Sequence, residues 1–249
     1  MSVALGIDIG GTGIKGARVN LSTGELVSER VKIATPEGAH PPDVLDVVQE
    51  IVDTLEHREH EPIGVCFPAV VTHGRTRSAS NVSQEWIDFP ADEYLTEELG
   101  QPIRMVNDAD AAGFAEASLG SARGIGGLVI LTTLGTGIGS AFLMDGVLVP
   151  NSELGLLEID GELAERRAAN SAREREGLSF EEWASRLTRF YTHVETLFAP
   201  ELFVVGGGVS ASHEKFFPLI EAGAPLVPAH FLNNAGIIGS ALWATKPQD

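Results

Sequence analysis

Short runs of apolar residues alternate with polar and glycine-rich turns along the first third of the chain. The runs at residues 3–9 and 14–20 flank one such turn and predict two paired strands, and residues 25–33 predict a third. Residues 43–55 carry apolar side chains at the 3.6-residue spacing of an amphipathic helix. Strands followed by a helix in this order indicate an α/β fold.

The same alternation continues to the end of the chain. It predicts strands at residues 63–67, 102–106 and 202–205, helices at residues 109–119, 180–198 and 236–244, and a further helix starting near Ser212. The helix at residues 180–198 has the clearest start, because Ser179 and Glu182 form a capping-box pattern. The pattern places the junction between two halves near residues 120–126.

The tetrapeptide Gly-Thr-Gly-Ile occurs at residues 11–14 and again at residues 135–138, each time between two predicted strands. Aligning the copies puts Asp8 and Lys15 of the first half opposite uncharged residues of the second. Such turns offer backbone N–H groups to phosphate oxygens, and a carboxylate beside one of them could hold a metal ion. Two ordinary hairpin turns are the alternative, but duplication with one charged half favours a phosphate site.

Two further segments place candidate chemistry after predicted strands. Asn107 and Asp108 stand where a strand ends and a helix begins, a common binding or catalytic position in α/β sheets. A helix cap supplied by Asp108 or Asp110 is the alternative. The glycine run at residues 206–208 follows another strand and is equally consistent with a plain loop or with a turn that faces a nucleotide.

Composition narrows the range of partners. The 249 residues are 43% hydrophobic, and no apolar run reaches the roughly 20 residues of a membrane-spanning helix. The formal net charge of −18 weighs against nucleic acid and anionic membranes, so we expect small substrates. The single cysteine, Cys66, can form neither an internal disulfide nor a cysteine-based metal site, and we expect a reducing, cytoplasmic setting.

Taken together, four motifs resemble the ROK family of sugar kinases in order and spacing. They are DIGGTGIK at residues 8–15, NDADAA at residues 107–112, LGTGIG at residues 134–139 and ELG at residues 153–155. The resemblance implies an actin-like ATPase fold in which two duplicated α/β domains close over a cleft. We expect these domains at residues 1–120 and 121–235. The closing helix at about 236–246 is expected to pack back onto the first domain. The resemblance also implies a homodimer.

The resemblance assigns roles to individual residues. Asp108 is the expected general base that takes the proton of a sugar hydroxyl, and Asp8 is the expected Mg²⁺ ligand, acting through water. The expected phosphate-donor residues are Gly10, Gly11, Thr12, Gly13, Lys15, Thr136, Gly137, Gly207 and Gly208. The expected sugar-binding residues are Asn81, Asn107, Asp108, Glu153 and Glu158.

Within the family, the chain is most similar to the branch that phosphorylates glucose or mannose with inorganic polyphosphate. The similarity lies in SNV at residues 80–82, ELGLLEIDG at residues 153–161, REREGL at residues 173–178 and PELFVVGGGVS at residues 200–210. We therefore expect transfer from polyphosphate to the 6-hydroxyl of glucose. ATP stays open as an alternative or additional donor, because the net charge opposes a polyanion.

The densest positive cluster contains Arg166, Arg167, Arg173 and Arg175, interspersed with glutamates. It is a candidate path for polyphosphate. A helix surface of i,i+4 ion pairs is the alternative.

Two departures from the family pattern matter. Leu156 stands where most relatives have a histidine that contacts the sugar, and losing one such hydrogen bond costs about 1–3 kcal/mol. The cysteine-rich zinc motif of many relatives is absent, so no structural zinc is expected. Three alternatives stay open: an ATP-dependent kinase of mannose, N-acetylhexosamine or fructose, a sugar-binding protein with impaired catalysis owing to Leu156, and a sugar-sensing regulator. The last is disfavoured, because residues 3–9 leave no room for a DNA-binding module.

Overall fold

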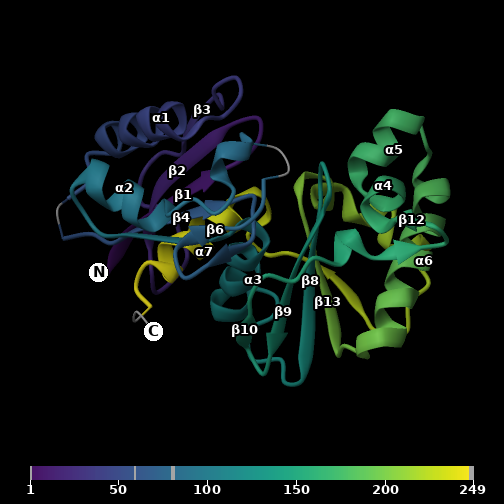
Figure 1. Cartoon of the computed structure of the whole chain (residues 1–249). Helices are drawn as coiled ribbons and strands as arrows, with labels where there is room; N and C mark the ends of the chain where they lie inside the picture. The colour runs from purple at the N-terminus through teal and green to yellow at the C-terminus, as the bar shows by residue number, and fades with distance from the viewer. Residues whose placement is uncertain (1, 59, 80–81, 247–249) are drawn as a thin grey trace. The chain divides into compact units, whose positions relative to one another are not determined.

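The computed structural model describes residues 2–58, 60–79 and 82–246 (Figure 1). The chain divides into two compact units, which we call unit 1 (Met1–Ala115 and Gly236–Asp249) and unit 2 (Glu116–Ala235). Each unit is built on a five-stranded sheet with its own apolar core. The assignment of these units as the two domains of the family remains our proposal.

Unit 1 is built on a mixed sheet with the strand order β3-β2-β1-β4-β7. Its strands are β1 (Val3–Ile9), β2 (Ile14–Asn20), β3 (Val31–Ile33), β4 (Ile63–Phe67) and β7 (Ile103–Asn107). The first three form an antiparallel meander, whereas β4 and β7 run parallel to β1. The carboxyl ends of β1, β4 and β7 therefore meet at one edge of the sheet.

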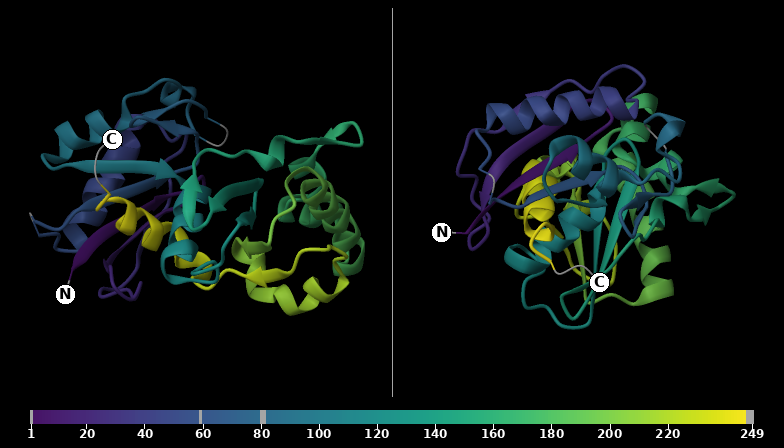
Figure 2. Two further views of the ribbon diagram at one scale, coloured as in Figure 1. Left: turned by 90° about the horizontal axis from the view of Figure 1, so that it is seen from below. Right: turned by 60° about the vertical axis from the view of Figure 1, so that its left-hand side comes forward.

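Helices cover both faces of this sheet (Figure 1). On one face, α1 (Pro41–Thr54) packs against β2, where a Cβ at Gly16 would lie 2.5 Å from the Ile51 side chain. On the other face lies α7 (Ala235–Trp243), which Figure 2 shows in yellow beside the strands of unit 1. Gly6 and Gly64 pair directly across β1 and β4, and both face α7.

Where α7 crosses Gly6 and Gly64, the contact leaves no room for a side chain on the strands. A Cβ at Gly6 would lie 1.9 Å from the carbonyl oxygen of Ile237, and one at Gly64 would lie 1.8 Å from that of Ser240. The helix backbone thus rests directly on the strand backbones. The same helix meets α3 (Asp108–Leu119), where Gly239 approaches Ala111 just as closely.

The remaining elements of unit 1 follow β4 in the chain. They are β5 (Val71–Thr72), β6 (Arg75–Thr76), the 3-10 turn η1 (Gln84–Trp86) and α2 (Ala91–Leu99). Trp86 is fully buried, its ring lies 4.6 Å from that of Phe67, and its indole N–H donates to the Ala39 carbonyl at 2.8 Å. Because the indole N–H is hydrogen-bonded, the large ring can be fully buried in the core.

Unit 2 repeats the meander of unit 1 in a sheet of order β10-β9-β8-β13-β14. Its strands are β8 (Leu128–Leu134), β9 (Ile138–Met144), β10 (Val147–Val149), β13 (Leu202–Gly206) and β14 (Leu226–Pro228), and a separate hairpin joins β11 (Glu158–Ile159) to β12 (Glu162–Leu163). β8 and β9 pair over seven residues, as β1 and β2 do. The duplication expected from the repeated tetrapeptide is therefore present in the backbone.

Three α-helices and four 3-10 turns complete unit 2. The helices are α4 (Ala164–Ala168), α5 (Asn170–Glu176) and α6 (Phe180–Phe198), and the turns are η2 (Leu154–Leu156), η3 (Gly208–Lys215), η4 (Phe217–Leu219) and η5 (Leu232–Asn234), as far as the described residues extend. The capping box at the start of α6 is confirmed, with Ser179 and Glu182 each accepting from the other's backbone N–H. Trp183, Leu187 and Phe190 of α6 are buried in the core of unit 2, whereas Leu197 near its end is 53% exposed.

Two predicted elements were wrong. The third strand spans only Val31–Ile33, because residues before it pair through single contacts such as Val19 with Leu26, and Ser28 Oγ accepts from the Arg18 N–H. The helix expected from Ser212 is the 3-10 turn η3, which starts at Gly208 and is interrupted by non-helical dihedral angles at Ser212. Within the described residues, no helix is long and apolar enough to cross a membrane.

The variant Gly64→Ala tests the direct contact between α7 and the sheet. Its Cβ meets a backbone carbonyl that cannot move independently, so we expect a loss of about 3 kcal/mol in the free energy of unfolding, or roughly 6–12 °C in Tm. The control is Gly126→Ala, whose Cβ would lie 3.8 Å from Asp145 Oδ1, an ordinary contact. Equal Tm values for the two variants would contradict the packing.

Asp92 gives a prediction for pH. Desolvation raises the pKa of this α2 carboxyl to about 6, although Oδ1 accepts from the Met105 N–H at 2.8 Å. Because the folded pKa lies above the unfolded value of about 3.9, stability from this group is present at low pH and is lost as pH rises through 6. Asp92→Asn should therefore raise the free energy of unfolding by about 1–3 kcal/mol over that of the wild type at pH 7.5. The gain should vanish near pH 4, and a gain of equal size at both pH values would exclude the carboxyl as its source.

Candidate functional site

Three adjacent strand ends in unit 1 bring two carboxylates to one buried thiol. In the parallel register Asp8 lies beside Cys66, and Phe67 lies beside Asn107, which directly precedes Asp108. The fully buried Cys66 Sγ lies 3.6 Å from Asp8 Oδ1. Burial raises the pKa of the Cys66 thiol, and the charges of Asp8 and Asp108 raise it further, so the thiol stays protonated and donates to Asp8.

Asp8 is held from two more sides. Lys15, its direct partner across β1 and β2, places Nζ 3.0 Å from Asp8 Oδ2, and the two side chains are 26% and 16% exposed. The first residue of unit 1's returning segment, Gly236, lies against the carboxylate, because a Cβ there would be 3.1 Å from Asp8 Cγ. Asp8 therefore has a fixed orientation, with a cation as its present neighbour.

Asn107 organises the amino end of α3. Its Oδ1 accepts from the N–H groups of Ala109 at 2.9 Å and Asp110 at 3.0 Å, and its Nδ2 donates to the Ala69 carbonyl at 3.1 Å. Asp108 Oδ1 also accepts from the Ala109 N–H, at 2.8 Å. The helix is thus capped chiefly by Asn107, and the half-buried Asp108 sits in the first helical turn, where the helix dipole favours a carboxylate.

In the first glycine turn, carbonyl groups are engaged from within unit 1. The Gly10 N–H donates to the Gly13 carbonyl at 3.1 Å, and Thr35 Oγ1 donates to the Gly10 carbonyl. Lys32, the partner of Lys15 across β2 and β3, lies so close that a Cβ at Gly13 would be 2.9 Å from its Cε. With the carbonyls of Gly10 and Gly13 engaged and two lysines adjacent, the turn offers N–H groups and positive charge to an anion.

The second glycine turn, in unit 2, is tied down in a comparable way. The Gly135 N–H donates to the Gly137 carbonyl at 3.0 Å. Ser171, at the start of α5, donates its N–H to the Gly135 carbonyl at 3.0 Å and its Oγ to the Thr136 carbonyl at 2.6 Å. The Glu165 carboxylate approaches the same turn, since a Cβ at Gly137 would lie 2.5 Å from its Oε2. The polarity left for a ligand is again that of the N–H groups.

The glycine run after β13 lies beside this second turn. Gly207 has φ of +85°, and a Cβ there would lie 2.5 Å from the Leu134 carbonyl oxygen, so only glycine fits. A pocket of about 500 Å³, which we call the glycine-turn pocket, opens next to it. It is lined by Leu134, Gly135, Thr136, Asn170, Ser171, Arg173, Glu174, Phe180, Gly208, Val209 and Ser212. Two of the three predicted glycine segments thus share one pocket.

The predicted sugar-binding residues are divided between the units. Asn107 and Asp108 belong to unit 1, whereas Glu153 and Glu158 belong to unit 2. Glu153 precedes η2; its side chain is exposed as a whole, but desolvation of the carboxyl and the nearby Glu165 charge raise its pKa. Glu158 is exposed on β11, and the predicted residue Asn81 lies outside the described residues.

The donor set of Asp8 fits magnesium rather than a metal that the protein encloses. Among the residues that the structure describes, no three His, Cys, Asp or Glu side chains lie close enough together to hold an ion. Mg²⁺ usually keeps several waters and is held by one or two carboxylates together with substrate phosphates. A single oriented carboxylate beside a glycine turn meets that requirement.

Several contacts at these turns were not predicted from the sequence. Thr35, Lys32, Ser171 and Glu165 reach the glycine turns from elements that are distant in the chain. For Lys32, the only available signal was its place in the third strand opposite Lys15. For Ser171 there was none, because the helix α5 that carries it follows no apolar periodicity.

The family model described as "ROK family" matches residues 4–153 of the chain. The polyphosphate glucokinase of Mycobacterium tuberculosis is 45% identical over 238 residues, which are 95% of this chain and 89% of that protein. The polyphosphate glucokinase of Mycobacterium leprae is 43% identical over 241 residues, 96% of this chain and 74% of that protein.

Solved structures agree with this picture. The inorganic polyphosphate/ATP-glucomannokinase of Arthrobacter sp. strain KM superposes with a TM-score of 0.93 at 48% identity and covers 98% of each chain. A ROK family glucokinase from Streptomyces griseus, solved with glucose and AMPPNP, gives a TM-score of 0.81 at 23% identity over 96% of this chain and 98% of that one. The expected fold class, an actin-like ATPase fold of duplicated α/β halves, is confirmed.

Proposed function

Because this chain belongs to the ROK family, we propose that it transfers the terminal phosphoryl group of inorganic polyphosphate to the 6-hydroxyl of glucose, with ATP as an alternative donor. It is an enzyme of the glucokinase type. The relatives named polyphosphate glucokinase support the acceptor and the donor, and the glucomannokinase named for both polyphosphate and ATP supports the second donor. We further propose a homodimer in the cytoplasm, as expected from the sequence.

One observation supports this reaction above the others, namely the placement of Asp8 and Asp108 around Cys66 at one edge of unit 1. Phosphoryl transfer requires alignment and charge neutralisation more than covalent chemistry, so one carboxylate base and one metal-binding carboxylate are sufficient. Asp8 would hold Mg²⁺ through water, and the ion would neutralise charge on the donor phosphates. Asp108 would then accept the proton of the sugar hydroxyl.

The base would act on the sugar hydroxyl. Asp108 accepts the proton of the 6-hydroxyl as that oxygen bonds to the terminal phosphorus, and the bond from phosphorus to the rest of the donor breaks. The products are glucose 6-phosphate and a donor shortened by one phosphate. Asn107 fixes the backbone on which Asp108 sits, and one N–H of its amide is left for a sugar hydroxyl.

The donor phosphates would bind to the glycine turns. In unit 1, the segment Gly10, Gly11, Thr12 and Gly13 supplies N–H groups, and Lys15, beside Asp8, supplies positive charge. In unit 2, Thr136 and Gly137 serve the donor, with Gly207 and Gly208 shaping the glycine-turn pocket. Asn81, Glu153 and Glu158 remain our proposed readers of the other sugar hydroxyls.

Leu156 is the observation that favours a second candidate function. This side chain is 54% exposed at the end of η2, so it presents an apolar surface where most relatives have a hydrogen-bonding histidine. A kinase of another hexose, or a protein that binds sugar with weak turnover, is consistent with that substitution. The first experiment is therefore an assay of glucose, mannose, N-acetylglucosamine and fructose, each with polyphosphate and with ATP. No turnover with any pair at high concentration would overturn the kinase assignment.

Asp108→Asn tests the proposed base. The amide keeps an oxygen that can accept from the Ala109 N–H but cannot take a proton, so we expect kcat to fall about 100-fold or more. Glucose should still raise the Tm of this variant as it does for the wild type. Turnover close to that of the wild type would remove Asp108 from the role of base.

Leu156→His tests whether this position limits sugar affinity. One added hydrogen bond should lower the KM for glucose about tenfold, while kcat with polyphosphate changes little. Leu156→Ala is the matched control, since it removes the exposed apolar side chain without adding a donor. An equal fall in KM for both variants would mean that the bulk of leucine, and not a missing hydrogen bond, weakens binding.

A further inference from the structure

Basic residues are concentrated in one stretch of unit 2. Six of the 17 lysines and arginines of this chain of net charge −18 are arginines between positions 166 and 189. Four of them, Arg166, Arg167, Arg175 and Arg186, line a pocket of about 590 Å³ together with Glu162 and Glu176. We call it the arginine pocket. Its lining carries four guanidinium groups and two carboxylates, a local charge opposite to that of the whole chain.

The carbonyl end of α4 fixes two of these guanidinium groups. Arg175 Nη2 donates to the Arg166 carbonyl at 2.8 Å, and Arg186 Nη1 donates to the Arg167 carbonyl at 3.1 Å. The oxygens of Glu176 accept one bond from each, at 2.8 Å from Arg175 and 2.7 Å from Arg186. Neither ion pair has i,i+4 spacing, because one joins adjacent residues and the other joins two helices. The alternative of an i,i+4 ion-pair surface therefore does not describe them.

Such bonding orients the arginines before any ligand binds. Each guanidinium has five N–H donors, and the bonds just named use only some of them. A side chain that is already oriented loses less conformational entropy on binding, and the planar fork suits phosphate oxygens. Arg166 is exposed and lies at the same pocket. The pocket is therefore suited to an anion with several phosphate groups.

The arginine pocket and the glycine-turn pocket share helix α5. Asn170, Ser171, Arg173 and Glu174 line the glycine-turn pocket, whereas Arg175 and Glu176 line the arginine pocket. At 100° per residue these two groups occupy different faces of the helix, which is seven residues and so about 10 Å long. Both pockets belong to unit 2, and a linear ligand has to pass only one short helix to reach both.

Arg173, on α5 at the glycine-turn pocket, adds a positive charge whose position is fixed. Its guanidinium carbon lies 4.8 Å from the centroid of the Phe180 ring, and its Nε donates to Asn170 Oδ1 at 3.0 Å. Stacking on the ring leaves the edge of the guanidinium for an anion. Positive charge thus continues from the glycine-turn pocket along α5.

We propose that the arginine pocket binds the distal phosphates of the polyphosphate donor, whose reacting end lies in the glycine-turn pocket. This inference rests on the proposed function. Linear polyphosphate carries negative charge on every phosphate and has no bulky end group, so it can follow α5 from one pocket to the other. The triphosphate of ATP is short and ends in a nucleoside, and it does not reach the arginine pocket. The arginine pocket therefore favours long donors over short ones.

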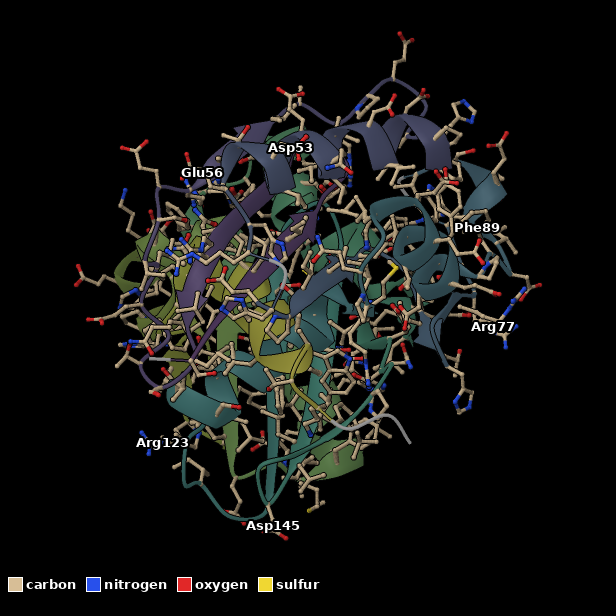
Figure 3. All side chains as sticks on the ribbon, turned by 90° about the vertical axis from the view of Figure 1, so that its left-hand side faces the viewer. Asp53, Glu56, Arg77, Phe89, Arg123 and Asp145 are labelled. Atoms are coloured by element: carbon tan, nitrogen blue, oxygen red, sulfur yellow. The ribbon has the colours of Figure 1, made fainter. Side chains whose placement is uncertain are left out.

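The test compares donors of different length. The double variant Arg166→Gln/Arg175→Gln, and Arg166→Gln alone in case the double variant is unstable, are assayed with glucose and long-chain polyphosphate, tripolyphosphate or ATP. We expect the KM for long-chain polyphosphate to rise about tenfold in the double variant and less in the single one, with the KM for the other two donors and kcat unchanged. The control for the single variant is Arg123→Gln, which also removes one positive charge, from an exposed residue of unit 2 (Figure 3) that lines neither pocket.

The outcomes separate this inference from the proposed function. If the wild type uses polyphosphate and the arginine variants raise the KM of all three donors equally, or of none, the arginine pocket is not a donor site. If the wild type transfers no phosphate from polyphosphate, the proposed function fails. The arginine pocket is then judged by calorimetric binding of long-chain polyphosphate, and affinity unchanged from the wild type in both variants overturns it.

Discussion

The direct contact of α7 with the strands of unit 1 is the constraint on which the candidate site depends. At Gly6 and Gly64 no side chain stands between the helix backbone and the sheet, so the helix lies where its first residues reach the ends of the strands. Gly236 then closes against Asp8 and Cys66. The same parallel register that aligns β1, β4 and β7 brings Asn107 and Asp108 to that edge. The packing of α7 on β1 and β4 thereby supports the strand ends from which the two carboxylates extend.

Duplication gives the two units glycine turns of similar design. In both, side-chain or backbone donors occupy the carbonyl groups, and N–H groups remain for an anion. The first turn lies next to Asp8 and two lysines, whereas the second lies next to Ser171, the Glu165 carboxylate and the glycine run after β13. One backbone plan thus carries different side chains in the two units.

Hydrophobic periodicity was enough to predict β1, β2, β4 and α6 to the residue, and the repeated tetrapeptide indicated the duplicated meander. Periodicity failed where single hydrogen bonds decide the backbone, as at Ser28 and in η3. Glycine turns and strand-end carboxylates pointed to the candidate site. Three contacts could not be predicted from the sequence: the helix cap by Asn107, the hydrogen bonds of Ser171 to the second turn, and the paired arginines. Each depends on how elements meet in the folded chain.

The central claim is that the terminal phosphate of polyphosphate moves directly to the 6-oxygen of glucose. Phosphorus NMR of the wild-type protein with glucose, Mg²⁺ and polyphosphate follows that atom through the reaction. We predict a growing phosphomonoester resonance coupled to the two protons on carbon 6 of glucose, matched by a loss of terminal phosphate groups. Accumulation of orthophosphate alone, or a phosphomonoester on another sugar carbon, would contradict the claim.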